Sequence, residues 1–479
     1  MTLHIPFDNS YAALPDRFYT RMHPSPVSKP GLLRINTKLA DELGIDPDAL
    51  RNEDGLAVLA GNTVAEGSDP LAQVYAGHQF GGWSPRLGDG RALLLGEVLD
   101  TNGLRRDIQL KGSGRTPYSR MGDGRAWLGP VLREYIVSEA MHALGIPTTR
   151  ALAAVTTGET VMREGAYPGA VLTRIAASHI RVGTFQYFAA QQDVEALQKL
   201  TDHVIARHYP EASNPLDLLN AVIDRQANLV AQWMGVGFIH GVMNTDNTQI
   251  AGETIDYGPC AFMDSYRADM VYSPIDQMGR YAYQRQPDIL VWNLAQFATS
   301  LLPLMGDDRD AAIEAATEAV HRFPTAFRAA WFKIFSAKIG LPDPVAEDAE
   351  LIHQLLAVME AGQADFTNTF RALGTSQARD EFSDRDAYDA WHRTWEERLA
   401  ASGTTPADRV QAMAVVNPVI IPRNHRIEEA IQAAVTGNLA PFERLTIALE
   451  SPFEDRSDIE DLRRPPSEQE VVHQTFCGT

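Results

Sequence analysis

The segment HGVMNTDNTQIAGETIDYG, residues 240–258, carries the features that decide the fold prediction. It follows residues 216–233, where apolar side chains recur at the spacing of a long amphipathic helix. A polar loop with Asp246 and Asn247 comes first, and an Asp-Tyr-Gly turn begins at Asp256. Carboxylate and amide oxygens are ligands that Mg²⁺ accepts, and the ion completes its shell with phosphate and water. The segment therefore predicts a metal and nucleotide site beyond the end of a helix.

Upstream of this segment, glycine and basic residues concentrate. Residues 77–124 hold 11 of the 35 glycines, and residues 86–125 hold eight Lys/Arg against five Asp/Glu. Glycine lets backbone N–H groups approach a phosphate closely, and the basic side chains neutralise its charge. Neither a P-loop nor a GxGxxG fingerprint is present. From composition alone, a glycine-rich hairpin with solvated arginines fits this zone as well as a phosphate site does.

Lys111 and Glu134 extend the pattern toward a known architecture. Lys111 ends an expected strand, and Glu134 lies on the first clear helix after it. A strand lysine that holds phosphates and pairs with a helix glutamate is the arrangement of protein kinases. Arg174 and Arg181 flank a later strand end and can add phosphate contacts or pair with surface acids. We therefore expect an α+β, protein-kinase-like bilobal fold.

The loop departs from kinases at Val242. Kinase loops read HRD or HGD, with the catalytic aspartate at this position, and valine cannot accept a proton. The nearest carboxylate is Asp246. The nucleotide site is therefore expected to be intact, whereas an ordinary kinase mechanism is in doubt.

Shifts in periodicity divide the chain into three parts. Residues 1–185 are expected to form an N-terminal extension and a strand-rich nucleotide-binding lobe, 186–449 a mainly helical lobe with the catalytic and metal-binding loops, and 450–479 a loosely held acidic tail. The first 75 residues are irregular apart from a helix near 36–43. Expected strands are 92–98, 107–110, 151–156 and 170–175, and expected helices are 131–144, 216–233, 289–302 and 310–335. Asn102-Gly103 predicts a type I′ hairpin turn with positive φ at both residues.

Composition sets limits on function. The chain has 479 residues, 44% hydrophobic and 22% charged, with a net charge of −20, which argues against a general nucleic-acid partner. Its two cysteines, Cys260 and Cys477, cannot build a disulfide framework and suit a reducing compartment. No apolar stretch is long enough to span a bilayer, and the first residues lack the pattern of a signal peptide. We expect a soluble cytoplasmic protein with no membrane partner, and the sequence does not predict its oligomeric state.

Five long motifs resemble the selenoprotein O (YdiU) family, protein adenylyltransferases with a pseudokinase fold. They are YAGHQFGGWSPRLGDGRALLLGE (75–97), DIQLKGSGRTPYSRMGDGRA (107–126), LREYIVSEAMHALGIPTTRAL (132–152), VLTRIAASHIRVGTFQ (171–186) and HGVMNTDNTQIAGETIDYGP (240–259). The resemblance covers nearly the whole chain. It implies a kinase-like fold with family-specific extensions, and transfer of AMP from ATP to Ser, Thr or Tyr hydroxyls of proteins, with release of pyrophosphate.

The resemblance also implies roles for particular residues. ATP would lie reversed relative to kinases, so that its α-phosphorus faces the acceptor and Asp246 acts as the base. Asn247 and Asp256 would bind Mg²⁺ or Mn²⁺. The nucleotide would contact Gly88, Gly90, Arg91, Lys111, Glu134, Asp123, Gly124, Arg174 and Arg181. Family members carry a cysteine or selenocysteine near the chain end, so Cys477 is either a redox-active thiol or an incidental one.

Two alternatives stay open at this point. The same ATP site could serve a protein or small-molecule kinase in which Asp246 is a relocated base. The chain could also be a non-catalytic pseudokinase that senses nucleotide. Val242 weighs against the first alternative, and the presence of both metal-type residues weighs against the second.

Overall fold

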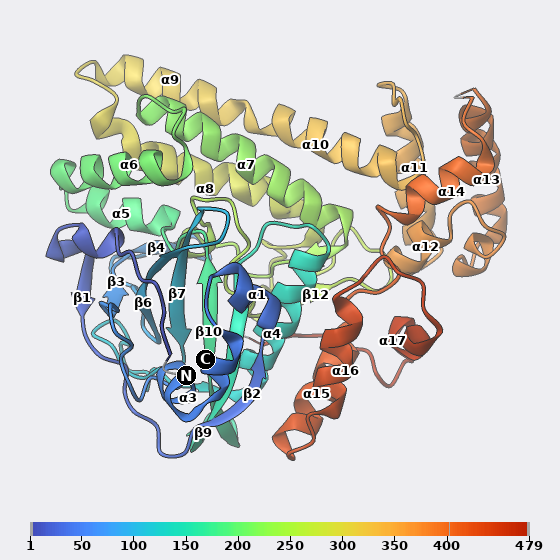
Figure 1. Cartoon of the computed structure of the whole chain (residues 1–479). Coiled ribbons are helices and arrows are strands. Elements are labelled where there is room, and N and C mark those ends of the chain that lie inside the picture. The colour runs from blue at the N-terminus through green and yellow to red at the C-terminus, as the bar shows by residue number, and fades with distance from the viewer. Residues whose placement is uncertain (1–2, 402, 477–479) are drawn as a thin grey trace.

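The computed structural model describes residues 3–401 and 403–476, and its centre is an eight-stranded antiparallel sheet (Figure 1). The strand order is β1-β3-β6-β7-β10-β9-β2, and β8 pairs with β10. The strands are β1 (Tyr19–Arg21), β2 (Gly31–Ile35), β3 (Leu71–Gln73), β6 (Ala92–Leu99), β7 (Arg105–Lys111), β8 (Ala126–Trp127), β9 (Arg150–Met162) and β10 (Ala166–Ala176). The four strands expected between residues 92 and 175 are confirmed.

The turn between β6 and β7 differs from the prediction. Gly103 has a φ of +76°, but Asn102 is not in the left-handed region, so the turn is not type I′. The Asp100 side chain accepts hydrogen bonds from the backbone N–H groups of Asn102 and Leu104. This carboxylate organises a longer loop and removes the need for positive φ at Asn102.

The first 75 residues are more ordered than the sequence pattern indicates. They contribute β1, β2 and β3 to the main sheet. They also form short helices: η1 (Tyr11–Ala13), η2 (Asp16–Phe18), α1 (Thr37–Glu42), α2 (Pro47–Arg51) and α3 (Glu53–Leu59). Strands of three to five residues are too short for alternation to show, and neighbouring strands define them instead.

Helix α4 (Leu128–Ala143) packs on β9 and β10 and carries Glu134 toward the site. Nearly every side chain of α4 is buried, because the sheet covers one side and α15 and α16 cover another. Gly145, with a φ of +78°, ends the helical path as expected. The sheet and α4 together place Lys111 opposite Glu134.

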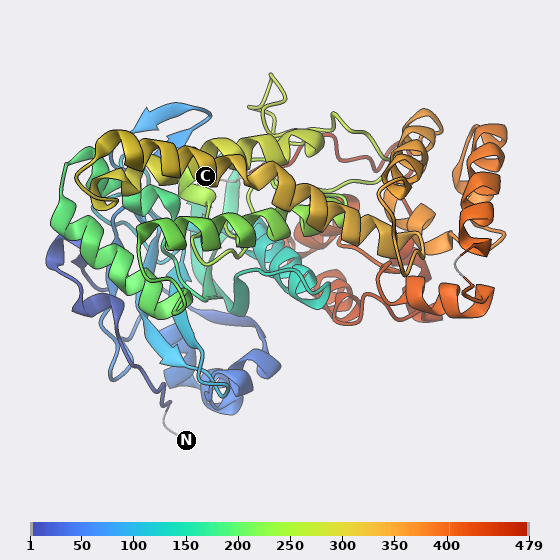
Figure 2. The ribbon, with the colours of Figure 1, turned by 90° about the horizontal axis from the view of Figure 1, so that it is seen from above.

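A layer of long helices lies beside the sheet, and Figure 2 shows α7 and α10 running across the molecule side by side. The helices of this layer are α5 (Val182–Ala190), α6 (Val194–His208), α7 (Pro215–Gly235), α8 (Gln286–Leu301), α9 (Arg309–His321) and α10 (Phe323–Lys338). Short elements between them are β11 (Phe238–Ile239), η3 (Thr245–Asn247), β12 (Ala261–Phe262), η4 (Tyr283–Arg285) and η5 (Leu302–Leu304). The helix expected over 310–335 is wrong as a single element: it divides at Arg322, because Pro324 starts a new helix in its first turn.

The C-terminal third forms two further helical groups at one side of the molecule (Figure 1). These elements are α11 (Asp348–Ala361), α12 (Phe366–Ala372), η6 (Ala378–Glu381), α13 (Arg385–Ala400), α14 (Pro406–Ala414), α15 (Asn424–Val435), α16 (Ala440–Leu449), η7 (Ser457–Ile459) and α17 (Glu460–Arg463). The remaining pair of strands, β4 (Gly77–Gln79) and β5 (Gly82–Ser84), forms a hairpin outside the main sheet.

The described part of the tail is packed, contrary to the prediction of a loosely held segment. Ile459 and Leu462 are buried in the main core, and the Arg423 guanidinium donates to the Arg463 carbonyl at 2.8 Å. Tail acids pair with arginines, as in Arg444–Asp461 at 2.6 Å. The prediction was based on the number of acidic residues, and composition does not show which arginines pair with them. Cys477 lies outside the described residues.

One hydrophobic core crosses the predicted boundary at residue 185. It joins Leu132 of α4, Phe185 of α5, Leu219 of α7 and Phe442 of α16. The division into 1–185, 186–449 and 450–479 therefore stays a prediction. None of the helices within the described residues combines the length and apolarity needed to cross a membrane.

Candidate nucleotide and catalytic site

Asp256 is the centre of a buried cluster of charges. Its Oδ1 accepts hydrogen bonds from Lys111 Nζ at 2.8 Å and Arg174 Nη1 at 2.7 Å, and its Oδ2 accepts one from Arg181 Nη1 at 2.7 Å. Burial raises the pKa of Asp256, but the three cations outweigh it and hold that pKa well below its ordinary value. The residue also has a φ of +62°, a conformation that non-glycine residues rarely adopt. The cations thus hold the carboxylate ionised and fixed.

Three elements bring these cations together. Lys111 ends β7, Arg174 lies on β10, and Arg181 precedes α5. Because β7 and β10 pair directly, their side chains reach the same face of the sheet. Glu134 completes the group from α4, with Lys111 Nζ at 2.6 Å and Arg174 Nη1 at 3.1 Å. The structure therefore brings together Lys111, Glu134, Arg174, Arg181 and Asp256.

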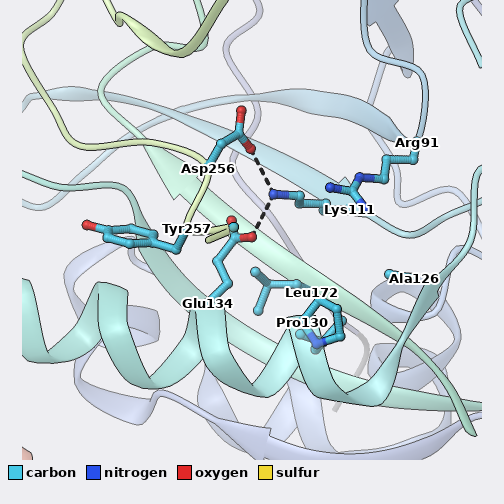
Figure 3. A pocket seen from close by; sticks show the side chains of 10 residues that line it. Arg91, Lys111, Ala126, Pro130, Glu134, Leu172, Asp256 and Tyr257 are labelled. Carbon is cyan, nitrogen blue, oxygen red and sulfur yellow. Dashed lines mark hydrogen bonds and ion pairs between the residues drawn. The ribbon is translucent and has the colours of Figure 1, made fainter. Parts of the chain in front are cut away.

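A cavity opens between Lys111 and α4, and Figure 3 shows the Lys111 ammonium between the carboxylates of Asp256 and Glu134. The cavity has about 370 Å³ of space free of protein atoms, part of it open to solvent. Its lining residues are Arg91, Lys111, Ala126, Pro130, Val131, Glu134, Leu172, Asp256, Tyr257 and Gly258. Arg91 and Lys111 supply positive charge on one side, above an apolar floor. This arrangement suits an anionic group that is shielded from bulk water.

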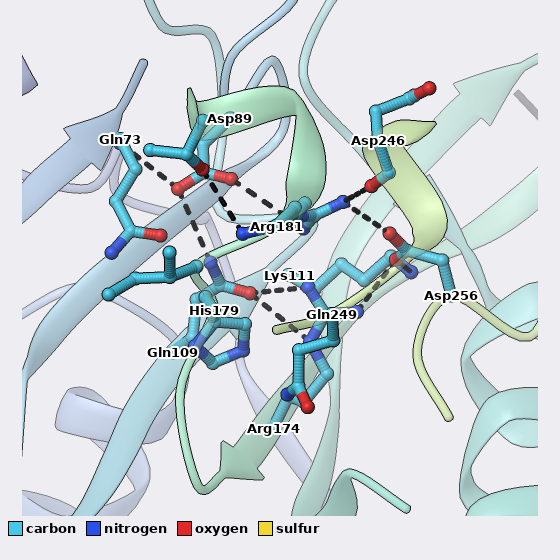
Figure 4. Close-up of polar contacts among 12 residues, drawn as sticks. Gln73, Asp89, Gln109, Lys111, Arg174, His179, Arg181, Asp246, Gln249 and Asp256 are labelled. Carbon is cyan, nitrogen blue, oxygen red and sulfur yellow. Dashed lines mark hydrogen bonds and ion pairs between the residues drawn. The ribbon is translucent and has the colours of Figure 1, made fainter. Parts of the chain in front are cut away.

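Arg181 connects this cavity to the loop that holds Asp246 (Figure 4). Its Nη1 donates both to Asp256 and to the backbone carbonyl of Asp246, the latter at 2.7 Å. Its guanidinium also lies 4.6 Å from the centre of the Tyr75 ring and 4.0 Å from Asp89 Oδ1. Burial raises the pKa of Asp89 to about 6, against the lowering effect of Arg181. One guanidinium thus joins the cation cluster to the loop that holds Asp246.

Asp246 itself lies in η3 and is 7% exposed. Burial raises its pKa to about 6, and a hydrogen bond from Gln79 opposes this shift. Gln79 Nε2 donates to Oδ2 at 3.0 Å, while Oδ1 has no hydrogen-bond partner among the described residues. A buried carboxylate with one unpartnered oxygen can accept a proton from a group brought beside it.

Asn247 and Asp256 offer oxygen ligands of the kind that Mg²⁺ and Mn²⁺ prefer. The Asn247 amide nitrogen donates to the Val242 carbonyl at 2.9 Å, which leaves its Oδ1 as the atom that could bind a metal ion. Both Asp256 oxygens already accept hydrogen bonds, so an ion there would replace a guanidinium or ammonium contact. Within residues 3–401 and 403–476, no three His, Cys, Asp or Glu side chains form a metal cage. Two protein ligands nevertheless fit Mg²⁺, which usually takes the rest from phosphate and water.

Among the other residues expected from the sequence, Arg91 lines the cavity, whereas Gly88, Gly90, Asp123 and Gly124 are not among its lining residues. Gly88 and Gly90 face Tyr118, where an added Cβ would come within 2.4 Å and 2.9 Å of it. At Gly124 an added Cβ would lie 2.1 Å from the Gly114 carbonyl, so this glycine fixes the 111–115 loop. The Asp123 carboxylate forms a two-pronged ion pair with Arg163, with both contacts at 2.9 Å.

Gln109 and Gln79 belong to the site but were not expected from the sequence. Gln109 Oε1 accepts from Arg174 at 2.6 Å, and its Nε2 donates to Asp89 at 3.3 Å. Alternation along β7 places Asp107, Gln109 and Lys111 on one face, and this polar pattern could have revealed Gln109. No local pattern identifies Gln79, because its partner lies 167 residues away.

Comparison with known proteins identifies the family of the chain. A family model described as "Protein adenylyltransferase SelO" matches residues 1–450. Proteins named "Protein nucleotidyltransferase YdiU" are 63% identical in Jannaschia sp., over 99% of both chains, and 61% identical in Ruegeria pomeroyi, over 100% of both. A further protein of that name, in Bradyrhizobium diazoefficiens, is 57% identical over the full length of both chains. The chain therefore belongs to the SelO family, and it is a nucleotidyltransferase.

Proposed function

We propose that this protein transfers AMP from ATP to Ser, Thr or Tyr hydroxyls of other proteins and releases pyrophosphate. The observation that carries the proposal is the junction at Arg181, which joins a cluster of three buried cations to the loop of a carboxylate with one free oxygen. The cations suit the departing phosphates, and the carboxylate suits the incoming hydroxyl.

The cation cluster accounts for the leaving group. Lys111, Arg174 and Arg181 converge within hydrogen-bond distance of one carboxylate. Phosphate oxygens placed beside them would meet the same donors, which are preorganised and shielded from water. Arg91 extends the positive wall of the cavity. These residues would stabilise the negative charge that grows on pyrophosphate as it leaves.

Asp246 accounts for the attacking group. Its carboxylate takes the proton from the acceptor hydroxyl, and the hydroxyl oxygen forms a bond to the α-phosphorus. The bond between the α-phosphorus and the oxygen that bridges to the β-phosphorus breaks, and pyrophosphate leaves with that electron pair. Val242 occupies the position of the catalytic base in kinases, and its apolar side chain cannot accept a proton. If ATP is bound in reverse relative to kinases, the α-phosphorus faces the acceptor. A base at Asp246, and not at residue 242, is consistent with this orientation.

Asn247 and Asp256 would hold Mg²⁺ or Mn²⁺, which supplies charge neutralisation to the phosphates when bound. The backbone around Gly88, Gly90, Asp123 and Gly124 would shape the entrance for the nucleotide. Together with the sheet and α4 on one side and the helical layer on the other, this arrangement supports a kinase-like bilobal fold. The two lobes would meet near residue 185.

ATP labelled on either the α- or the γ-phosphate tests the proposal. The purified protein and a heat-inactivated cell extract serve as acceptors, with Mg²⁺ or Mn²⁺ present. Label retained on protein from the α-position alone is the expected result. Label from the γ-position alone would identify a kinase, and bound ATP without any transfer would identify a nucleotide sensor.

A further inference from the structure

The β4–β5 hairpin reaches from the N-terminal part of the chain to the loop that carries Asp246. The backbone N–H of His78 donates to Thr245 Oγ1 at 2.8 Å, and that of Phe80 donates to Asn244 Oδ1 at 3.0 Å. These two hydrogen bonds, one from β4 and one from the residue that follows it, fix the relative position of hairpin and loop. The side chain between these donors, Gln79, is thereby held against Asp246.

The two oxygens of the Asp246 carboxylate have different surroundings. Gln79 Nε2 donates to Oδ2 at 3.0 Å, and Oδ1 has no partner among the described residues. Arg181 contacts the backbone carbonyl of Asp246 and does not form a hydrogen bond with this carboxylate. The Gln79 amide is therefore the side-chain donor that sets the orientation of the carboxylate.

Gly77 lets β4 pack closely against the unpartnered oxygen, which is itself buried. A Cβ at this position would lie 2.9 Å from Asp246 Oδ1 and 3.1 Å from its Cβ. Gly77 does not have a positive φ, so glycine is required here for space and not for backbone conformation. The same strand thus holds Oδ2 through Gln79 and leaves room for the carboxylate through Gly77.

The strand is itself anchored from behind. The His78 ring lies 4.8 Å from the Trp83 ring and 5.1 Å from the Trp292 ring, measured between ring centres. A hydrogen bond of 2.9 Å joins His78 Nδ1 to Gln186 Nε2. These contacts tie β4 to α5 and α8, so Gln79 has a rigid support.

We propose that Gln79 is the positioning residue for the catalytic base, and that its hydrogen bond to Oδ2 holds the Asp246 carboxylate in one orientation. This inference rests on the proposed function and names the residue that orients its base. Without the amide donor, the carboxylate would rotate about its side-chain torsions, and it would hold the orientation suited to the acceptor for only part of the time.

Two variants and a matched control test the proposal. Gln79→Met keeps the length of the side chain and removes the donor, and Gln79→Glu places a second acceptor against the carboxylate. Gln198→Met is the control, because Gln198 also donates to an aspartate, Asp202 at 2.8 Å, but on the exposed helix α6. The measurements are the rate of AMP transfer at saturating ATP, the KM for ATP, and the melting temperature of the full chain.

We expect kcat to fall by about 10- to 100-fold in Gln79→Met, and further in Gln79→Glu, while KM for ATP and the melting temperature stay at their wild-type values. The control should keep wild-type kcat. A variant at Gln79 with wild-type kcat would overturn the assignment, as would a loss that appears only in KM or in melting temperature. Absence of AMP transfer by the wild-type protein would overturn the proposed function and this inference with it.

Discussion

Asp256→Ala removes the carboxylate on which three buried cations converge. In the wild-type protein, Lys111, Arg174 and Arg181 all donate to Asp256. Glu134 remains as a partner for the first two, at 2.6 Å and 3.1 Å. Arg181 keeps a backbone carbonyl, a carboxylate 4.0 Å away and the face of the Tyr75 ring. The variant therefore leaves uncompensated positive charge in the interior.

The expected cost follows from these contacts. Removing one partner of a buried ion pair costs about 3–5 kcal/mol, and the remaining Glu134 places this variant near the lower end, at about 3 kcal/mol. The entropy of unfolding is about 2.1 cal/mol/K per residue, or roughly 1 kcal/mol/K for a chain of this length. The melting temperature should therefore fall by about 3 °C without nucleotide. AMP transfer should be lost, because the variant also lacks a metal ligand.

Thermal melts with and without metal-free ATP check the reasoning. Phosphate oxygens can replace the missing carboxylate, so ATP in the presence of a chelator should raise the melting temperature of Asp256→Ala more than that of the wild type. Asp389→Ala is the control, because Asp389 pairs with Arg379 at 2.8 Å on the surface, where water screens the pair, so the melting temperature should change little. A variant that melts at the wild-type temperature and gains no more from ATP would refute the account of the cation cluster.

Three further predictions concern Lys111, the divalent metal and the buried Lys338. Lys111→Met should reduce AMP transfer by about 100-fold and leave the melting temperature within about 2 °C, because Arg174 still pairs with both carboxylates; a variant that unfolds at the growth temperature would contradict this. Chelation of divalent metal should abolish transfer, and Mg²⁺ or Mn²⁺ should restore it; transfer that persists would overturn the assignment of Asn247 and Asp256. Burial lowers the pKa of Lys338 to about 7. Between pH 7 and 10.5 this side chain therefore carries a proton in the unfolded chain but not in the folded chain. The free energy of unfolding should consequently rise with pH in this window. Lys338→Met should therefore stabilise the protein on the order of 3 kcal/mol at pH 8 in urea unfolding, with the gain vanishing above pH 10.5; equal stability at pH 8 would contradict it.

Much of the central sheet could be predicted because its strands carry local signals. The runs at 92–98 and 170–175 are apolar enough to define buried strands, and Gly145 with Pro147 marks the end of α4. The same holds for the cation cluster, since Lys111 ends one such strand and Arg174 lies in another. The pairing of β7 with β10 then brings these two side chains together. Their residue types suggest that they share a site, but their positions along the chain do not show that they are neighbours.

The rest depends on contacts between distant segments. Strands β1 and β3 are three residues long and are defined by their neighbours in the sheet. Gln79 reaches Asp246 only because a hairpin outside the sheet folds onto η3. The composition of the tail predicted a loosely held segment, because an excess of acidic residues does not reveal the arginines that pair with them. In each instance the deciding interaction joins residues that no local periodicity connects.

The products of a single turnover test the central claim most directly. The protein is incubated with ATP and Mg²⁺ or Mn²⁺, the released nucleotide product is identified, and the modified side chain is located by mass spectrometry of the labelled protein. The account predicts pyrophosphate in a one-to-one ratio with AMP attached to a Ser, Thr or Tyr hydroxyl, and loss of both products in Asp246→Asn. Release of ADP together with a phosphorylated side chain would contradict it.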